Sequence, residues 1–223
     1  MELQFLGSGD AFGSGGRFNT CFHVSDKRGA FLIDCGASSM IAIRKFGIDP
    51  NAIRAVLITH LHGDHFGGLP FFILDAQLVS RRTAPLIIAG PPGLRDRLTI
   101  AMETFFPGST KVERRFATEI RELEPRCTHD VEGIEVTPFE VEHPCGAPPF
   151  ALRLTVDGKT LCYSGDMEWV EGLREGATGA DLFIAETYFF DKQVSFHLDY
   201  ATLARHLSEL GAKRVVLTHM SPG

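Results

Sequence analysis

The sequence predicts an α/β (α+β) fold in which two β-sheets pack face to face and helices cover the outer faces. Short apolar or alternating runs, typical of strands, occur in both halves of the 223-residue chain. Segments with helical periodicity lie between them, so each half has its own helices. No low-complexity linker, charge block or internal repeat divides the chain, and we expect a single domain over residues 1–223.

The first half contains five runs with the length and composition of strands. They are Leu3–Leu6, Cys21–Val24, Ala30–Ile33, Ala55–Thr59 and Leu86–Ala89. Helical periodicity is found at Ser38–Phe46, Leu69–Val79 and Gly93–Phe105. Gly47 is placed to end the first of these helices, and Asp49-Pro50 favours a further helix start.

The second half contains five more predicted strands. They are Ile134–Glu142, Phe150–Val156, Thr160–Tyr163, Asp181–Ala185 and Arg214–Thr218. One helix is predicted over Tyr200–Leu210, where Gly211 follows as a natural C-terminal residue.

The composition excludes several classes of protein. The apolar fraction of 44% and the charged fraction of 22% are ordinary for a globular protein. No apolar run reaches the roughly 18 residues of a membrane span, so we expect no membrane partner. The five cysteines include no C-x-x-C pair, which argues against a disulfide framework or a zinc knuckle. With no secretory signal visible at the N-terminus, we expect a cytoplasmic protein.

The charge pattern predicts a small-molecule substrate. The net charge is −6, and the basic residues are scattered apart from Arg81-Arg82 and Lys111–Arg115. Because nucleic-acid binders usually have a clustered basic face, we expect no stable nucleic-acid partner.

One short stretch, THLHGDH, holds four metal-binding side chains: His60, His62, Asp64 and His65. Alternate residues of an extended backbone point the same way, so His60 and His62 can bind one metal ion together. Imidazole and carboxylate ligands suit zinc, with iron or manganese as alternatives. The sequence therefore predicts a metal site here rather than a solvated histidine-rich loop.

Glycines occur within and after this cluster. Gly63 is expected to let the chain turn sharply and bring Asp64 and His65 toward a second metal ion. Gly67-Gly68 is expected to let the following helix begin close behind the site.

Three more candidate ligands follow predicted strands. His143 comes after Ile134–Glu142, Asp166 lies in LCYSGD, and His219 ends RVVLTH. Each is a polar, metal-competent side chain beyond the end of an apolar strand, where loops commonly carry functional sites. Together with the cluster they indicate a larger metal site, although each alone has an ordinary structural explanation.

This pattern resembles the metallo-β-lactamase superfamily over essentially the whole chain. The segments FLGSGDAFGSGGRFNT, FLIDCG, THLHGDHFGGLP, YSGD and LTHMS are most similar to its ribonuclease Z-like branch. The resemblance implies an αββα sandwich of two mixed sheets and a site for two divalent ions, with zinc expected. It implies that His60, His62 and His143 bind the first ion, that Asp64, His65 and His219 bind the second, and that Asp166 bridges both.

Such a site predicts hydrolysis by a metal-activated water. The chain has no G-x-S-x-G motif that would supply a serine nucleophile instead. In the family, the residue matching Asp64 also orients the water or accepts its proton. The resemblance further implies that His197, supported by Glu186, contacts the phosphate or protonates the leaving group.

Departures from the family pattern bear on the substrate. The 223 residues leave no room for the tRNA-binding arm, Phe18 separates Arg17 from Asn19, and Met167 stands where the family has threonine. We therefore expect a phosphodiesterase acting on a small phosphodiester or cyclic phosphate. The alternatives are a lactone or carboxylic ester hydrolase, a tRNA 3′-processing endoribonuclease, and a metal-stabilised binding scaffold without activity. The resemblance also allows a homodimer.

Overall fold

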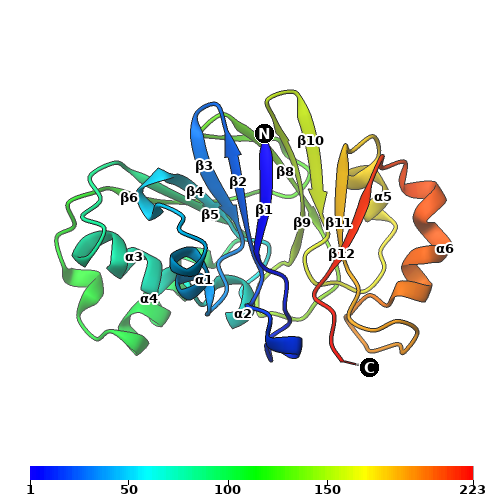
Figure 1. The fold of residues 1–223 in the computed structure, drawn as a ribbon, viewed down its shortest axis with the longest axis horizontal. Helices are drawn as coiled ribbons and strands as arrows, with labels where there is room; N and C mark the ends of the chain where they lie inside the picture. Colours follow the sequence, from blue (N-terminus) through cyan, green and yellow to red (C-terminus); the bar gives the residue numbers. More distant parts are fainter. Residues whose placement is uncertain (223) are drawn as a thin grey trace.

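The computed structural model describes residues 1–222 and contains two six-stranded sheets that face each other (Figure 1). The first sheet has the order β1 (Glu2–Gly7), β2 (Cys21–Asp26), β3 (Gly29–Ile33), β4 (Ile53–Leu57), β5 (Leu86–Gly90) and β6 (Thr118–Glu122). The second has the order β12 (Val215–Thr218), β11 (Leu182–Glu186), β10 (Lys159–Tyr163), β9 (Phe150–Val156), β8 (Ile134–Glu140) and β7 (His129–Val131). Both sheets mix parallel and antiparallel pairs.

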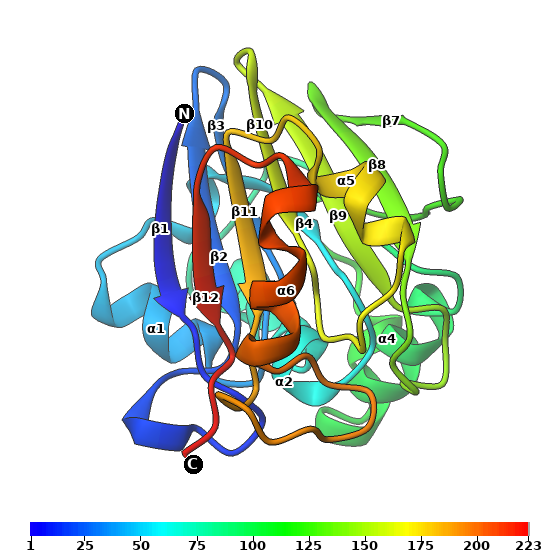
Figure 2. The same ribbon diagram turned by 90° about the vertical axis from the view of Figure 1, so that its right-hand side faces the viewer.

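Helices cover the outer faces of both sheets (Figures 1 and 2). The first sheet carries α1 (Ser39–Lys45), α3 (Leu69–Leu78) and α4 (Leu94–Phe105). The second carries α5 (Gly172–Ala177) and α6 (Tyr200–Leu210). A short helix, α2 (Gly63–Phe66), lies at the edge where the chain leaves β4. This architecture confirms the predicted αββα sandwich.

The main core lies between the two sheets. Phe22, Phe31 and Leu57 from the first sheet are buried against the second, which contributes Phe150 and Tyr163. Burial of such large side chains, at about 25 cal/mol per Å² of apolar surface, stabilises the contact between the sheets. Two further apolar clusters join each sheet to its helices.

Most predicted boundaries differ from the structure by one or two residues, and three of the differences have a clear local cause. β4 ends at Leu57 rather than Thr59. The Thr59 N–H donates to the Asp34 carboxylate and so is not available to the backbone of a neighbouring strand. β8 ends at Glu140 rather than Glu142. The segment that would pair with residues 141 and 142 is Pro148-Pro149, just before β9, and proline has no N–H to donate. Asp49-Pro50 begins only a 3₁₀ turn over Pro50–Ala52.

The topology brings several strand ends to one edge of the sandwich. β3 and β4 run parallel in the first sheet, and β10, β11 and β12 run parallel in the second. β8 points the same way as β10, because each pairs antiparallel with β9. The carboxyl ends of these strands lie at the lower edge in Figure 1, beside α2. Among residues 1–222, no helix has both the length and the apolar character needed to cross a bilayer.

Candidate metal centre

Both sheets contribute side chains to this edge. From the first sheet, the loop after β4 places His60 and His62, and α2 places Asp64 and His65. From the second sheet, His143 follows β8, Asp166 follows β10 and His219 follows β12. Six of these seven residues are buried, and His62 is half-buried.

The seven side chains fall into two groups that could each hold a metal ion. Within each group, one ligand atom per residue lies within 4.8 Å of all the others. The first group contains His60, His62 and His143, and the second contains Asp64, His65, Asp166 and His219. The structure thus brings together every residue that the sequence suggested as a metal ligand.

Asp166 lies between the two groups. Its Oδ2 is 4.0 Å from the Nε2 atoms of both His60 and His143, in the first group. Its Oδ1 is 3.2 Å from His65 Nε2, and its Oδ2 is 3.3 Å from His219 Nε2, in the second. A single carboxylate therefore faces both groups.

The ring nitrogens and carboxylate oxygens of the two groups are arranged for binding cations rather than for hydrogen bonding to one another. His60 Nε2 and Asp166 Oδ1 are buried and have no hydrogen-bond partner among the described residues. His143 Nδ1 lies 2.8 Å from the Phe196 carbonyl, which can only accept, so Nδ1 carries the proton and Nε2 is free. That Nε2 atom is 3.0 Å from His62 Nδ1. Ring nitrogens and carboxylate oxygens turned toward a common centre are the ligands that zinc prefers.

The two groups differ in their electrostatics. Burial lowers the pKa of His60 well below its ordinary value and also lowers the pKa of His62, so both rings are neutral ligands at neutral pH. In the second group burial also opposes charge, but Asp166, Asp64 and Glu186 outweigh it and raise the pKa of His219 to about 10. The carboxylates of the second group thus favour a nearby positive charge. A divalent ion would supply this charge in place of the proton on His219.

Asp34, which the sequence analysis did not select, supports the metal-facing histidines from behind. This buried residue follows β3, and its carboxylate is 2.7 Å from His65 Nδ1. It also accepts hydrogen bonds from the Thr59 N–H and hydroxyl, and the Thr59 hydroxyl is 3.1 Å from His60 Nδ1. The rule that selected His143, a polar residue just after an apolar strand, would also have selected Asp34.

Glu186 and His197 form a pair beside the second group. Glu186 is fully buried at the end of β11, and its Oε1 is hydrogen-bonded to His197 Nδ1. Burial lowers the pKa of His197, but the hydrogen bond and charge of Glu186 outweigh it and raise the pKa. Tyr188 stacks on the His197 ring at 4.5 Å between ring centroids. The two residues meet as the sequence analysis expected.

Comparison with known proteins places this arrangement in a family. The ribonuclease Z of Exiguobacterium sp. (strain ATCC BAA-1283 / AT1b) is 26% identical over 270 residues, covering 99% of this chain and 89% of that relative. Human tRNase Z, short form (ELAC1), is 30% identical with a TM-score of 0.83, covering 99% of this chain and 93% of that one. The metallo-β-lactamase fold protein YhfI from Bacillus subtilis is 19% identical with a TM-score of 0.80, covering 99% of this chain and 86% of that one.

The two facing sheets and the His/Asp centre at their edge define a metallo-hydrolase of the metallo-β-lactamase fold, in its ribonuclease Z-like branch. Within that class, the chain belongs to the family described as anti-Pycsar protein Apyc1, whose model matches residues 1–223.

These relatives correct one prediction. The scattered basic residues led us to expect a small-molecule substrate and no nucleic-acid partner, but relatives aligned over nearly the whole chain are named for RNA or tRNA. Net charge is a weak guide here because it omits the charge of any metal ions that the centre would hold. A backbone phosphate can meet those ions without a broad basic surface.

Proposed function

We propose that this protein is a metal-dependent phosphodiesterase with two divalent ions, zinc being expected and manganese or iron being the alternatives. In this proposal His60, His62 and His143 hold one ion, Asp64, His65 and His219 hold the other, and Asp166 bridges them. The position of Asp166 between the two groups supports the bridging role. When bound, the ions would polarise the phosphate and lower the pKa of a water molecule.

The chain's own residues would then orient the reactants and move protons. Asp64 is 8% exposed, and its Oδ2 lies 3.2 Å from His219 Nε2 at the centre. In this proposal Asp64 also orients the water or accepts its proton. His197 would contact the phosphate or protonate the leaving oxygen. Glu186, which bonds the other ring nitrogen, would fix the ring and its tautomer.

The observation that carries the proposal is the His197–Glu186 pair beside the metal groups. The ligand atoms of Asp166, Glu186, His197 and His219 all lie within 4.8 Å of one another. A histidine held by a buried carboxylate suits an anionic phosphodiester and its poor leaving group. A lactone hydrolase has less need of such a pair, because a strained ester is neutral and opens readily.

Two substrate classes have support. A small phosphodiester, such as a cyclic nucleotide, is favoured by internal segments of a relative that have no counterpart in this chain. The alignment with the Exiguobacterium ribonuclease Z spans 270 positions, more than the 223 residues of this chain, so that relative has segments absent here. An RNA precursor is favoured by the names of the relatives, since a ribonuclease also cleaves phosphodiester bonds.

A substrate panel tests the proposal and separates these classes. Zinc-loaded protein would be given bis(p-nitrophenyl) phosphate, cyclic nucleotides, a tRNA precursor transcript and a lactone at equal concentrations. The proposal expects hydrolysis of at least one phosphodiester and a much lower rate on the lactone. Rapid lactone opening with all phosphodiesters left intact would refute it.

Two further properties belong to the proposal. We take residues 1–223 as a single domain, which is supported by a metal centre with ligands from both sheets. We also take the protein as cytoplasmic, which is supported by the cysteines at positions 21, 35, 127, 145 and 162, all of them free thiols.

A further inference from the structure

We propose that Glu168 is a positioning residue that holds both the metal-facing His143 and the proposed proton donor His197 through the backbone of Phe196. The part that concerns His197 rests on the proposed function. The part that concerns His143 needs only its position in the metal centre.

Three hydrogen bonds join the segments that carry these residues into a closed circuit. The Glu168 N–H donates to the Glu142 carbonyl at 2.9 Å, next to His143. The Glu168 carboxylate accepts from the Phe196 N–H at 3.1 Å. The Phe196 carbonyl accepts from His143 Nδ1 at 2.8 Å, which closes the circuit. Glu168 thus holds the Phe196 backbone at its N–H, and the carbonyl of the same residue orients His143.

Phe196 adopts a conformation that a bulky residue avoids. Its φ is +67°, in the left-handed region that favours glycine and asparagine. The turn around it is tight, since the His197 N–H donates to the Val194 carbonyl at 3.2 Å. Such a conformation persists only when surrounding contacts hold it, and here the Glu168 carboxylate and His143 hold its two polar groups.

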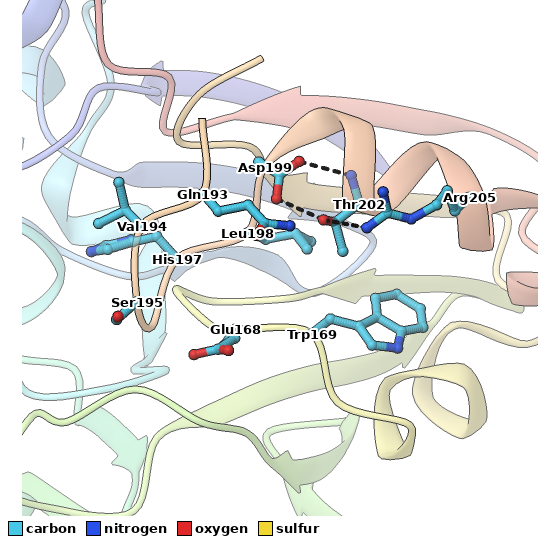
Figure 3. A pocket seen from close by; sticks show the side chains of 10 residues that line it. All are labelled: Glu168, Trp169, Gln193, Val194, Ser195, His197, Leu198, Asp199, Thr202 and Arg205. Carbon is cyan, nitrogen blue, oxygen red and sulfur yellow. Dashed lines mark hydrogen bonds between the residues drawn. The ribbon is translucent and has the colours of Figure 1, made fainter. Parts of the chain in front are cut away.

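Figure 3 shows Glu168 beside the loop that carries Val194, Ser195 and His197. These residues line a cavity of about 310 Å³ between this loop, Trp169 and α6. The loop therefore has open space on one side, and the exposed Glu168 carboxylate holds it through the Phe196 N–H. Without that contact, we expect the Phe196 peptide to relax, which would move its carbonyl from His143 and displace the adjacent His197.

The first experiment compares Glu168→Ala with two other variants of the holoprotein. Zinc affinity would be measured by competition with a chromogenic chelator, and kcat would be measured on bis(p-nitrophenyl) phosphate. Loss of the group hydrogen-bonded to a metal ligand typically weakens metal binding by about 10–100-fold, and for His143 that group is the Phe196 carbonyl. Because Glu168 acts through the Phe196 backbone, we expect E168A to give a loss near the lower end, about 10-fold, with a lower kcat. E168Q keeps an oxygen acceptor and should retain most of both. Asp191→Ala, which removes an exposed carboxylate from the same loop, should match the wild type in zinc affinity.

The second experiment tests the role of the Phe196 backbone directly. Glycine adopts a positive φ readily, so E168A/F196G should recover zinc affinity relative to E168A. Phe196→Val should reproduce the loss with the carboxylate intact, because a β-branched residue resists a positive φ.

Equal zinc affinity in E168A and D191A would overturn the proposal, and so would a double variant no better than E168A. If E168A folds poorly, F196V decides the test with the carboxylate intact, and wild-type zinc affinity in F196V would overturn the proposal. The chelator arm needs no substrate. An inactive wild type would therefore refute the proposed function, while the inference on Glu168 and His143 would still be decided by zinc affinity.

Discussion

The Glu186 carboxylate contacts four residues around the candidate metal centre: Met167, His197, Leu198 and His219. Its Oε1 bonds His197 Nδ1 and lies 3.5 Å from His219 Nδ1. Its Oε2 accepts from the Met167 N–H at 2.7 Å and from the Leu198 N–H at 3.5 Å. A buried carboxylate needs such partners, because leaving one unpaired would cost several kcal/mol. The same contacts fix the loops on both sides of the centre.

His197→Ala tests the proposed proton transfer. We expect kcat/KM on bis(p-nitrophenyl) phosphate to fall by about 10²–10⁴-fold, the usual contribution of a general acid. Zinc binding should stay near the wild-type level, since His197 is outside the proposed ligand set. His129→Ala, on the edge strand β7, is the matched histidine control. A loss of less than threefold in H197A would exclude this role.

Asp34→Asn tests the support behind His65. The variant keeps the shape of the side chain and tolerates the φ of +57° at this position, but it removes the charge that faces His65 Nδ1. We expect zinc affinity to fall by about 10–100-fold in a chelator competition assay. Asp96→Asn, exposed on α4, should change nothing. Identical affinities in the two variants would show that Asp34 serves the fold alone.

The sequence could predict which side chains meet at the candidate metal centre, but not every contact behind them. Candidate ligands could be identified by residue type and position. His60 and His62 are two residues apart after one predicted strand, and His143 follows another. The contact between His143 and Phe196 could not be anticipated, because these residues are 53 positions apart and the acceptor is a backbone carbonyl. A carbonyl has no signature in the sequence.

At the scale of elements, close backbone packing sets the start of α3. A Cβ built on Gly68 would lie 2.3 Å from the Gly36 carbonyl oxygen, so only glycine fits there. This agrees with the expectation that Gly67-Gly68 lets the helix begin close behind the site. The chain also turns at Gly63 and brings Asp64 and His65 inward, as expected, but Gly63 has no positive φ, so the helical turn of α2 makes this turn without the special freedom of glycine.

Gly68→Ala and Gly63→Ala should therefore differ. In urea denaturation we expect G68A to lower the free energy of unfolding by about 1–3 kcal/mol, because backbone atoms must move apart. A Cβ at the exposed Gly63 would meet no atom within 4 Å. G63A should be neutral, or more stable by about 0.4–1 kcal/mol through the unfolded chain. Equal losses in both variants would contradict the close approach seen at Gly68.

Strongly patterned elements were predictable, and short or polar ones were not. The Tyr200–Leu210 helix was predicted with the observed bounds because its apolar stripe is clear and Gly211 ends it with a φ of +64°. β6 was not predicted because its sequence, TEIRE, is polar, and β7 was not predicted because it has only three residues. α5 was not predicted either, since two glycines weaken its helical pattern.

At the scale of the whole molecule, the metal centre joins the two sheets. The first sheet supplies the cluster from His60 to His65, and the second supplies His143, Asp166 and His219. Ions held between the sheets would be bound by the folded state and not by the unfolded chain, so their binding free energy would add to stability. We therefore expect the stability of the whole fold to depend on metal content.

Zinc should therefore raise the stability of the protein. At a free concentration of about 100 times the Kd, each ion should add about 2.7 kcal/mol to the free energy of unfolding. The measurement is urea denaturation with and without a chelator. A single substitution in each sheet, His62→Ala or His143→Ala, should reduce the gain. Identical curves with zinc and with chelator would mean that no ion is held by the folded state.

The most direct test follows hydrolysis of bis(p-nitrophenyl) phosphate while zinc is added stepwise to metal-free protein. The account predicts little activity with the first equivalent per chain and a rise to a plateau as the second binds, because both ions share Asp166 and act together. Full activity at one equivalent, or no phosphodiester hydrolysis at any zinc level, would contradict it.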